Sequence, residues 1–221
     1  MTQDTSGLER EVQVAVEADS AGIAERVRTI TLDALSRGTL DAQGLREVMG
    51  AVIRGAQQAR VDVDARHTAA LKEAMRGLDD ALATAAQATQ LAVQEAIGRS
   101  SEFSREDLKH SLDQLSSLEG DFITALGDAA RATSGQAQAT LRDLAEHARS
   151  SGTAVGGRVR DALGELGQAA GELARAQFDG GVRTMRNQAE LFAGLAAGVL
   201  RGLADRLQPG ASDQREPDRR D

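Results

Sequence analysis

The stretch from Leu45 to Ala96 contains no proline, aromatic or cysteine residue. It consists mainly of Ala, Leu, Val, Gln, Glu and Arg, most of which lose little conformational freedom on entering a helix. The composition predicts a single helix of about 80 Å, at about 1.5 Å per residue. A chain dominated by such a stretch is expected to fold as helices packed on helices.

Apolar side chains in this stretch recur about every eleven residues, or about 3.67 residues per helical turn. A seven-residue repeat fails, because it reaches Gly55 and Asp62. The spacing predicts a nearly straight or slightly right-handed helix. The three apolar rows are Leu45, Ala56, His67, Leu78 and Thr89; Val48, Ala59, Ala70, Ala81 and Ala92; and Val52, Val63, Ala74, Ala85 and Ala96. The heaviest apolar patch, expected to pack best, comprises Leu71, Met75, Leu78 and Leu82.

Few large side chains are available to fill a thick core. Hydrophobic residues make up 41% of the 221 residues, but aromatic residues make up only 2%. No segment shows the alternation or the β-branched runs of a strand. The sequence therefore predicts an all-α fold: an elongated antiparallel bundle of long, alanine-rich, amphipathic helices that resemble a coiled coil.

Glycine-containing breaks divide the chain into four predicted helical segments. Gly38 and Gly98 mark helix ends, and bends are expected near Ser20 and Gly135. Gly180 leaves open whether the last segment is one helix or two, and whether it packs on the others. The predicted helices span 8–37, 41–98, 104–149 and 152–207, forming one bundle (8–207) between disordered termini at 1–7 and 208–221.

Charge and composition exclude several classes of protein. The 34 acidic residues outnumber the 26 basic ones, so nucleic acid is not an expected partner. Cysteine is absent, which removes disulfides, thiolate nucleophiles and cysteine metal sites. The most apolar run, Leu191 to Leu200, is about half the length of a transmembrane helix. Because the first residues also do not resemble a signal peptide, we expect a cytoplasmic protein without a transmembrane segment.

The most distinctive local feature is a run of glycines four residues apart near the C-terminus. Such glycines form a smooth strip on one helix face and permit close contact. One interpretation is a helix that docks on a lipid or polymer surface, or that self-associates. The favoured alternative is close packing within the bundle. The segment comprises Leu191, Phe192, Gly194, Leu195, Gly198, Val199, Gly202 and Leu203.

No pattern of residues predicts an enzyme. His67 lies on an apolar row and is expected to have a solvated or hydrogen-bonded ring. The acidic pair Asp79 and Asp80 is expected on a solvated face. Phosphate-binding loops, dinucleotide fingerprints and nucleophile elbows are absent from the sequence. We therefore expect no catalytic residue, cofactor or metal.

Several segments together resemble an uncharacterised family of proteobacterial all-helical proteins, from about Ser6 to Leu207. The resemblance implies no activity and no site residues. A looser, composition-level likeness, as in Ala81–Ala96, is to phasins and to apolipoprotein-like amphipathic helices. The segments that carry the family resemblance are Leu40–Val48, Ala88–Ala96, Phe103–Lys109, His147–Thr153 and Gly198–Asp205.

The predicted function is that of a non-enzymatic bacterial helical protein. It would associate with a hydrophobic surface, such as a granule or membrane, or scaffold partners through amphipathic helices. Val182–Leu207 would be the attachment segment. The alternative is a purely structural homo-oligomeric coiled coil with no ligand.

Overall fold

The computed structural model describes residues 5–37, 42–60, 64–98 and 105–177. These residues contain helices and no strand, so the predicted all-α bundle is confirmed. The predicted disordered start at 1–7 is too long, because the first helix begins at Thr5. The helices are α1 (Thr5–Ala18), α2 (Ile23–Arg37), α3 (Ala42–Gln58), α4 (Asp64–Gly98), α5 (Arg105–Ala132), α6 (Gly135–Ser151) and α7 (Ala154–Gln177).

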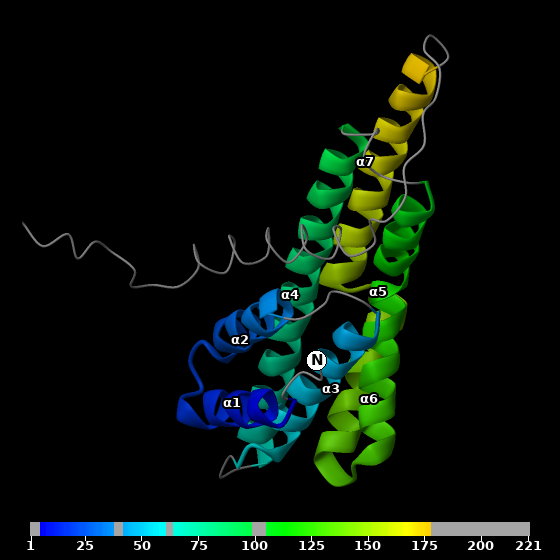
Figure 1. The fold of residues 1–221 in the computed structure, drawn as a ribbon. Coiled ribbons are helices and arrows are strands. Elements are labelled where there is room, and N and C mark those ends of the chain that lie inside the picture. The colour runs from blue at the N-terminus through cyan, green and yellow to red at the C-terminus, as the bar shows by residue number, and fades with distance from the viewer. Residues whose placement is uncertain (1–4, 38–41, 61–63, 99–104, 178–221) are drawn as a thin grey trace, which may run out of the picture.

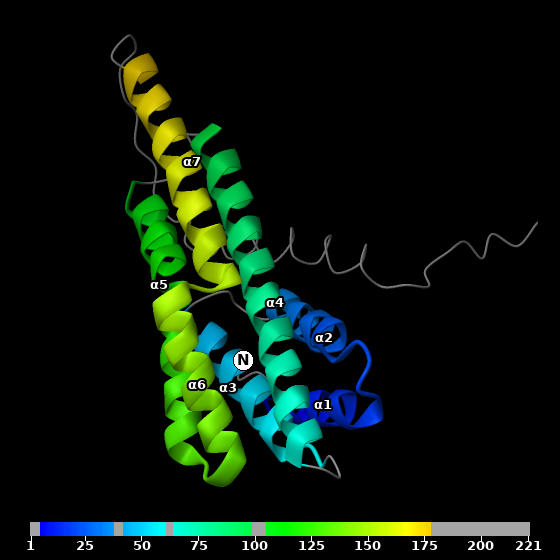
Figure 2. The same cartoon turned by 180° about the vertical axis from the view of Figure 1, so that it is seen from behind.

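Helix α4 forms the long axis of the molecule (Figure 1). Helices α1 and α2 lie on one side of its first half, while α5 and α6 lie on the other, and the view from behind shows the same order (Figure 2). Helix α7 follows the second half of α4. The two run in the same direction, since Asp79 contacts Val155 and Gln90 contacts Glu165 farther along both helices. The bundle thus mixes parallel and antiparallel neighbours.

The predicted single helix over 41–98 is wrong, because α3 ends at Gln58 and α4 begins at Asp64. The backbone N–H of Arg60 donates to a carboxylate oxygen of Glu17 at 2.7 Å, instead of continuing the helical ladder. The sequence from Val61 to Asp64 alternates β-branched and aspartate residues, which are weak helix formers. The division therefore combines weak helix formers with a hydrogen-bond acceptor that another helix supplies.

Two predicted bends are helix ends. The 8–37 segment divides into α1 and α2 at Gly22, which has φ +72°, and Arg26 binds the carbonyl of Ala15 across the turn at 3.0 Å. The 104–149 segment divides into α5 and α6 at Gly135, which has φ +67°. This left-handed conformation suits glycine and reverses the chain into a hairpin. Beyond Gln177, the predicted helix to 207 lies outside the described residues.

The predicted apolar rows are buried, even though the helix that carries them is interrupted. All their described members are buried except His67 and Thr89, which are half-buried. The predicted heavy patch (Leu71, Met75, Leu78 and Leu82) is at most 2% exposed. The period therefore identified the inward face correctly on both α3 and α4.

Two glycines allow the N-terminal helices to cross in backbone contact. A Cβ at Gly55 of α3 would overlap the carbonyl oxygen of Glu9 in α1. A Cβ at Gly77 of α4 would overlap the carbonyl oxygen of Ala24 in α2. At these two crossings the helices are so close together that only glycine, which has no side chain, fits between them.

Candidate functional site

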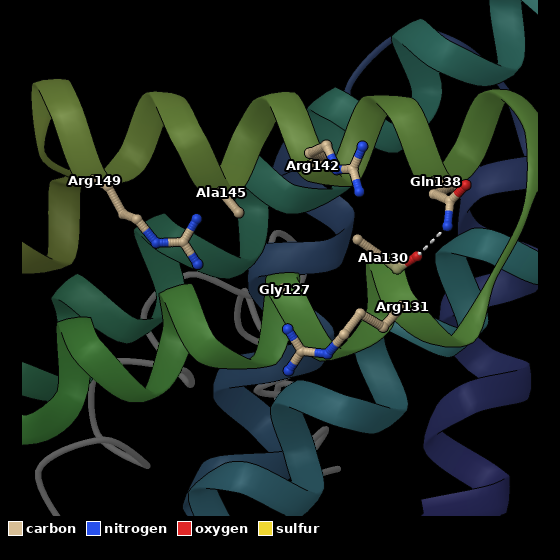
Figure 3. A pocket seen from close by; sticks show the side chains of 7 residues that line it. All are labelled: Gly127, Ala130, Arg131, Gln138, Arg142, Ala145 and Arg149. Atoms are coloured by element: carbon tan, nitrogen blue, oxygen red, sulfur yellow. Dashed lines mark hydrogen bonds between the residues drawn. The ribbon is translucent and has the colours of Figure 1, made fainter.

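A hollow of about 210 Å³ lies between α5 and α6, and we call it the arginine pocket (Figure 3). It forms because the turn at Gly135 folds α6 back along α5. At one end, the amide of Gln138 donates to the carbonyl of Ala130 at 3.1 Å. The lining residues are Gly127, Ala130, Arg131, Gln138, Arg142, Ala145 and Arg149.

Two guanidinium groups in this pocket lie close to Gly127, which has no side chain. The position that a Cβ of Gly127 would take lies 3.5 Å from Nη2 of Arg149 and 3.8 Å from Nη1 of Arg131. Figure 3 shows these two side chains reaching toward the gap from α6 and α5 respectively. Small residues complete the floor, because Ala130 and Ala145 are 6% and 1% exposed. The pocket thus has arginine side chains at its rim and small side chains at its base.

The positive charge of the arginine pocket is only partly neutralised. Arg131 is paired with Asp128. Arg142 and Arg149 form no ion pair with any residue that the structure describes. They lie seven residues apart, so two helical turns place them on one face of α6. Guanidinium groups in this arrangement are suited to binding oxyanions.

A second polar cluster joins α4, α5 and the start of α7, and we call it the α7 junction. The carboxylate of Asp79 accepts hydrogen bonds from the backbone N–H groups of Ala154 at 2.8 Å and Val155 at 2.9 Å. Thr153 accepts one from the N–H of Gly156 at 2.8 Å and donates to Glu119 at 3.0 Å. The junction thereby satisfies N–H groups that the first turn of a helix leaves without partners.

Burial raises the pKa of Asp79, although its two backbone hydrogen bonds act in the opposite direction. The nearby charges of Asp80 and Glu119 also raise it. The prediction that Asp79 lies on a solvated face is therefore wrong. This carboxylate is half-buried and caps a helix that begins 75 residues later. We assign the α7 junction a structural role.

The residues singled out from the sequence lie elsewhere. The glycine-spaced segment, Leu191 to Leu203, lies outside the described residues. His67 is half-buried, and its buried Nε2 has no hydrogen-bond partner in the described part of the chain. Within the described ranges, no group of His, Cys, Asp or Glu is arranged to hold a metal ion. Sequence reasoning missed the arginine pocket, although the spacing of Arg142 and Arg149 on one helix face was a usable signal.

No helix among the described residues is long and apolar enough to cross a membrane. Comparisons with curated proteins and with solved structures give no significant match. A family model, described as a family of unknown function (DUF6781), matches residues 1–209. This match confirms the resemblance to an uncharacterised family. The chain therefore belongs to that family of unknown function.

Proposed function

We propose that the protein is a non-enzymatic helical scaffold, which binds partners on the polar outside of a self-contained body. The observation that carries this proposal is the burial of the apolar rows within one chain. Among the described residues, the exposed large hydrophobic side chains are Val14 and Leu91, at 59% and 45%. Isolated apolar side chains of this kind are normal on a monomer surface.

The same observation weighs against the two rival mechanisms. A bundle that opens onto a granule would break the contacts of α4, whose largest apolar residues are almost fully buried. A homo-oligomeric coiled coil would need apolar rows free to pair between chains. The described rows already have partners inside the chain, so a scaffold with a closed body is the better-supported function.

Attachment to a hydrophobic surface is proposed separately for residues 182–207. This segment contains the glycine-spaced apolar run and carries four arginines against two acidic residues. Apolar area combined with positive charge favours binding to anionic interfaces. Attachment by this segment would hold the scaffold at a surface, in a bacterial cytoplasm, without opening its body.

The test compares the full chain with a chain ending at Gly181. Light scattering should give a monomer for both, and circular dichroism should show that both are helical. In co-sedimentation with anionic liposomes and polyester granules, only the full chain should bind. If neither chain binds, the proposal that residues 182–207 attach to a surface is wrong, and only the scaffold proposal stands. Binding by the shortened chain, or an oligomer that unfolds on dilution, would overturn the closed body.

A further inference from the structure

We propose that the arginine pocket binds a dianionic phosphoryl group, either inorganic phosphate or the end of a phosphomonoester. The ligand would lie over Gly127, between the guanidinium groups of Arg131 and Arg149, with Arg142 contributing from the same face of α6. This inference does not depend on the scaffold or attachment proposals, because it concerns a site within the folded hairpin of α5 and α6.

The charge of the site matches a dianion. Arg131 already has Asp128 as its partner, whereas Arg142 and Arg149 have no ion pair with described residues. These two arginines carry two positive charges, and a phosphomonoester carries about −1.5 to −2 at pH 7. A carboxylate would neutralise only one of them. Arg142 and Arg149 are exposed, and what sets them apart from other exposed arginines is that both line one hollow, where their positive charge is available to an anionic ligand.

The size and shape of the site select a small group. A volume of about 210 Å³ is below the roughly 300–1,000 Å³ of pockets that enclose drug-sized ligands. The pocket can therefore hold one tetrahedral anion, but not a complete nucleotide. Planar guanidinium groups donate two parallel hydrogen bonds to phosphate oxygens, and the missing side chain of Gly127 leaves room for the anion between them.

The first experiment is calorimetric titration of the full chain with inorganic phosphate at pH 7.5, at constant ionic strength. We expect saturable binding to phosphate and much weaker binding to acetate. The double variant Arg142→Gln/Arg149→Gln should bind phosphate at least tenfold more weakly. Arg158→Gln is the matched control, because Arg158 is an exposed arginine on α7 outside the pocket, and it should bind like the parent protein.

A second variant fills the pocket without removing charge. Gly127→Ala places a methyl group in ordinary contact with Arg149 and Arg131, at 3.5 and 3.8 Å. The helix should persist, since alanine favours it more than glycine does. Phosphate affinity should nevertheless fall several-fold. Unfolding curves for each variant would separate this effect from a loss of structure.

Two further arms identify the source of the phosphoryl group. Glycerol 3-phosphate tests a soluble monoester, and vesicles containing phosphatidic acid test a lipid headgroup. Binding in either arm that is lost in Arg142→Gln/Arg149→Gln, but kept in Arg158→Gln, supports the proposal and names the source. The proposal is overturned if no arm binds, or if Arg158→Gln weakens binding as much as the pocket variants do.

Discussion

Glycine is used in two different ways in the two halves of this bundle. At Gly55 and Gly77, it lets one helix backbone rest on the carbonyl oxygen of another. At Gly156 of the α7 junction, it instead makes room for the carboxylate of Glu119. The first contact joins two rigid backbones, whereas the second joins a backbone to the end of a flexible side chain.

This difference teaches that a glycine's importance depends on what occupies the space beside it. A backbone carbonyl in a packed helix cannot move without moving the helix. A glutamate side chain can rotate to another staggered conformation at modest cost. The N-terminal crossings should therefore be intolerant of any side chain, and the α7 junction should adjust.

The largest effect is expected at the helix crossing of α2 and α4. Gly77→Ala places a methyl group against the carbonyl of Ala24, so the helices must separate. Overpacking of this kind should lower the free energy of unfolding by about 3 kcal/mol, measured by urea denaturation. The control is Gly120→Ala on α5, where nothing lies within 4 Å and stability should rise by up to about 1 kcal/mol. Equal effects at both positions would contradict the close crossing.

Removing the carboxylate at the α7 junction should have the next largest effect. Asp79→Ala leaves the N–H groups of Ala154 and Val155 without their acceptor. Loss of this helix cap, which binds one exposed and one part-buried N–H group, should lower the free energy of unfolding by about 1–2 kcal/mol. The neighbouring Asp80→Ala is the control, since its side chain makes no hydrogen bond or ion pair to a described residue, and it should change stability by about 0.5 kcal/mol or less. Similar changes in the free energy of unfolding for the two variants would show that the hydrogen bonds of Asp79 do not stabilise the protein.

A smaller change in the free energy of unfolding is expected at Gly156, which faces a side chain instead of a backbone carbonyl. Gly156→Ala should displace the Glu119 side chain and remove its hydrogen bond with Thr153. That loss, about 1 kcal/mol, is offset by the better helix propensity of alanine, also about 1 kcal/mol. The net change in urea denaturation should therefore stay within about 1 kcal/mol. A loss as large as that of Gly77→Ala would show that the junction is as rigid as the crossings.

The two halves should also respond to pH with opposite signs. The pKa of Asp79 is raised in the folded state, so protonation of this carboxylate adds to the free energy of unfolding at low pH. That added stability is lost as the pH rises from about 3.8, the ordinary pKa, through the raised pKa. The hydrogen bond from the N–H of Arg60 lowers the pKa of Glu17 in the folded state. The ionised Glu17 carboxylate therefore adds to the free energy of unfolding above about pH 4.5, and this added stability is lost as the pH falls through the lowered pKa.

Urea denaturation across this pH range provides the test. As pH rises, Asp79→Asn should gain stability relative to the parent protein, whereas Glu17→Gln should lose it. Both effects should be the smallest of the set. The same sign for both variants would contradict the assigned environments of the two carboxylates.

The sequence predicted the inward faces of the helices better than their ends. The apolar rows were correct because burial follows the 3.67-residue period on any helix that carries them. The division between Gln58 and Asp64 was missed, because the acceptor that replaces the helical bond of Arg60 is Glu17, on another helix. Asp79 was misjudged for the same reason, since the two donors that it binds are 75 and 76 residues away.

The sequence by itself therefore determined the all-α class, the absence of cysteine chemistry and the buried stripes of α3 and α4, because propensity and periodicity act over one or two turns. Only the tertiary structure decided that α4 and α7 run in parallel, that Asp79 caps α7, and that Arg131 and Arg149 both approach Gly127. These features depend on which helices become neighbours. Neighbours are selected by close contacts between residues far apart in the chain, and no local pattern contains that information.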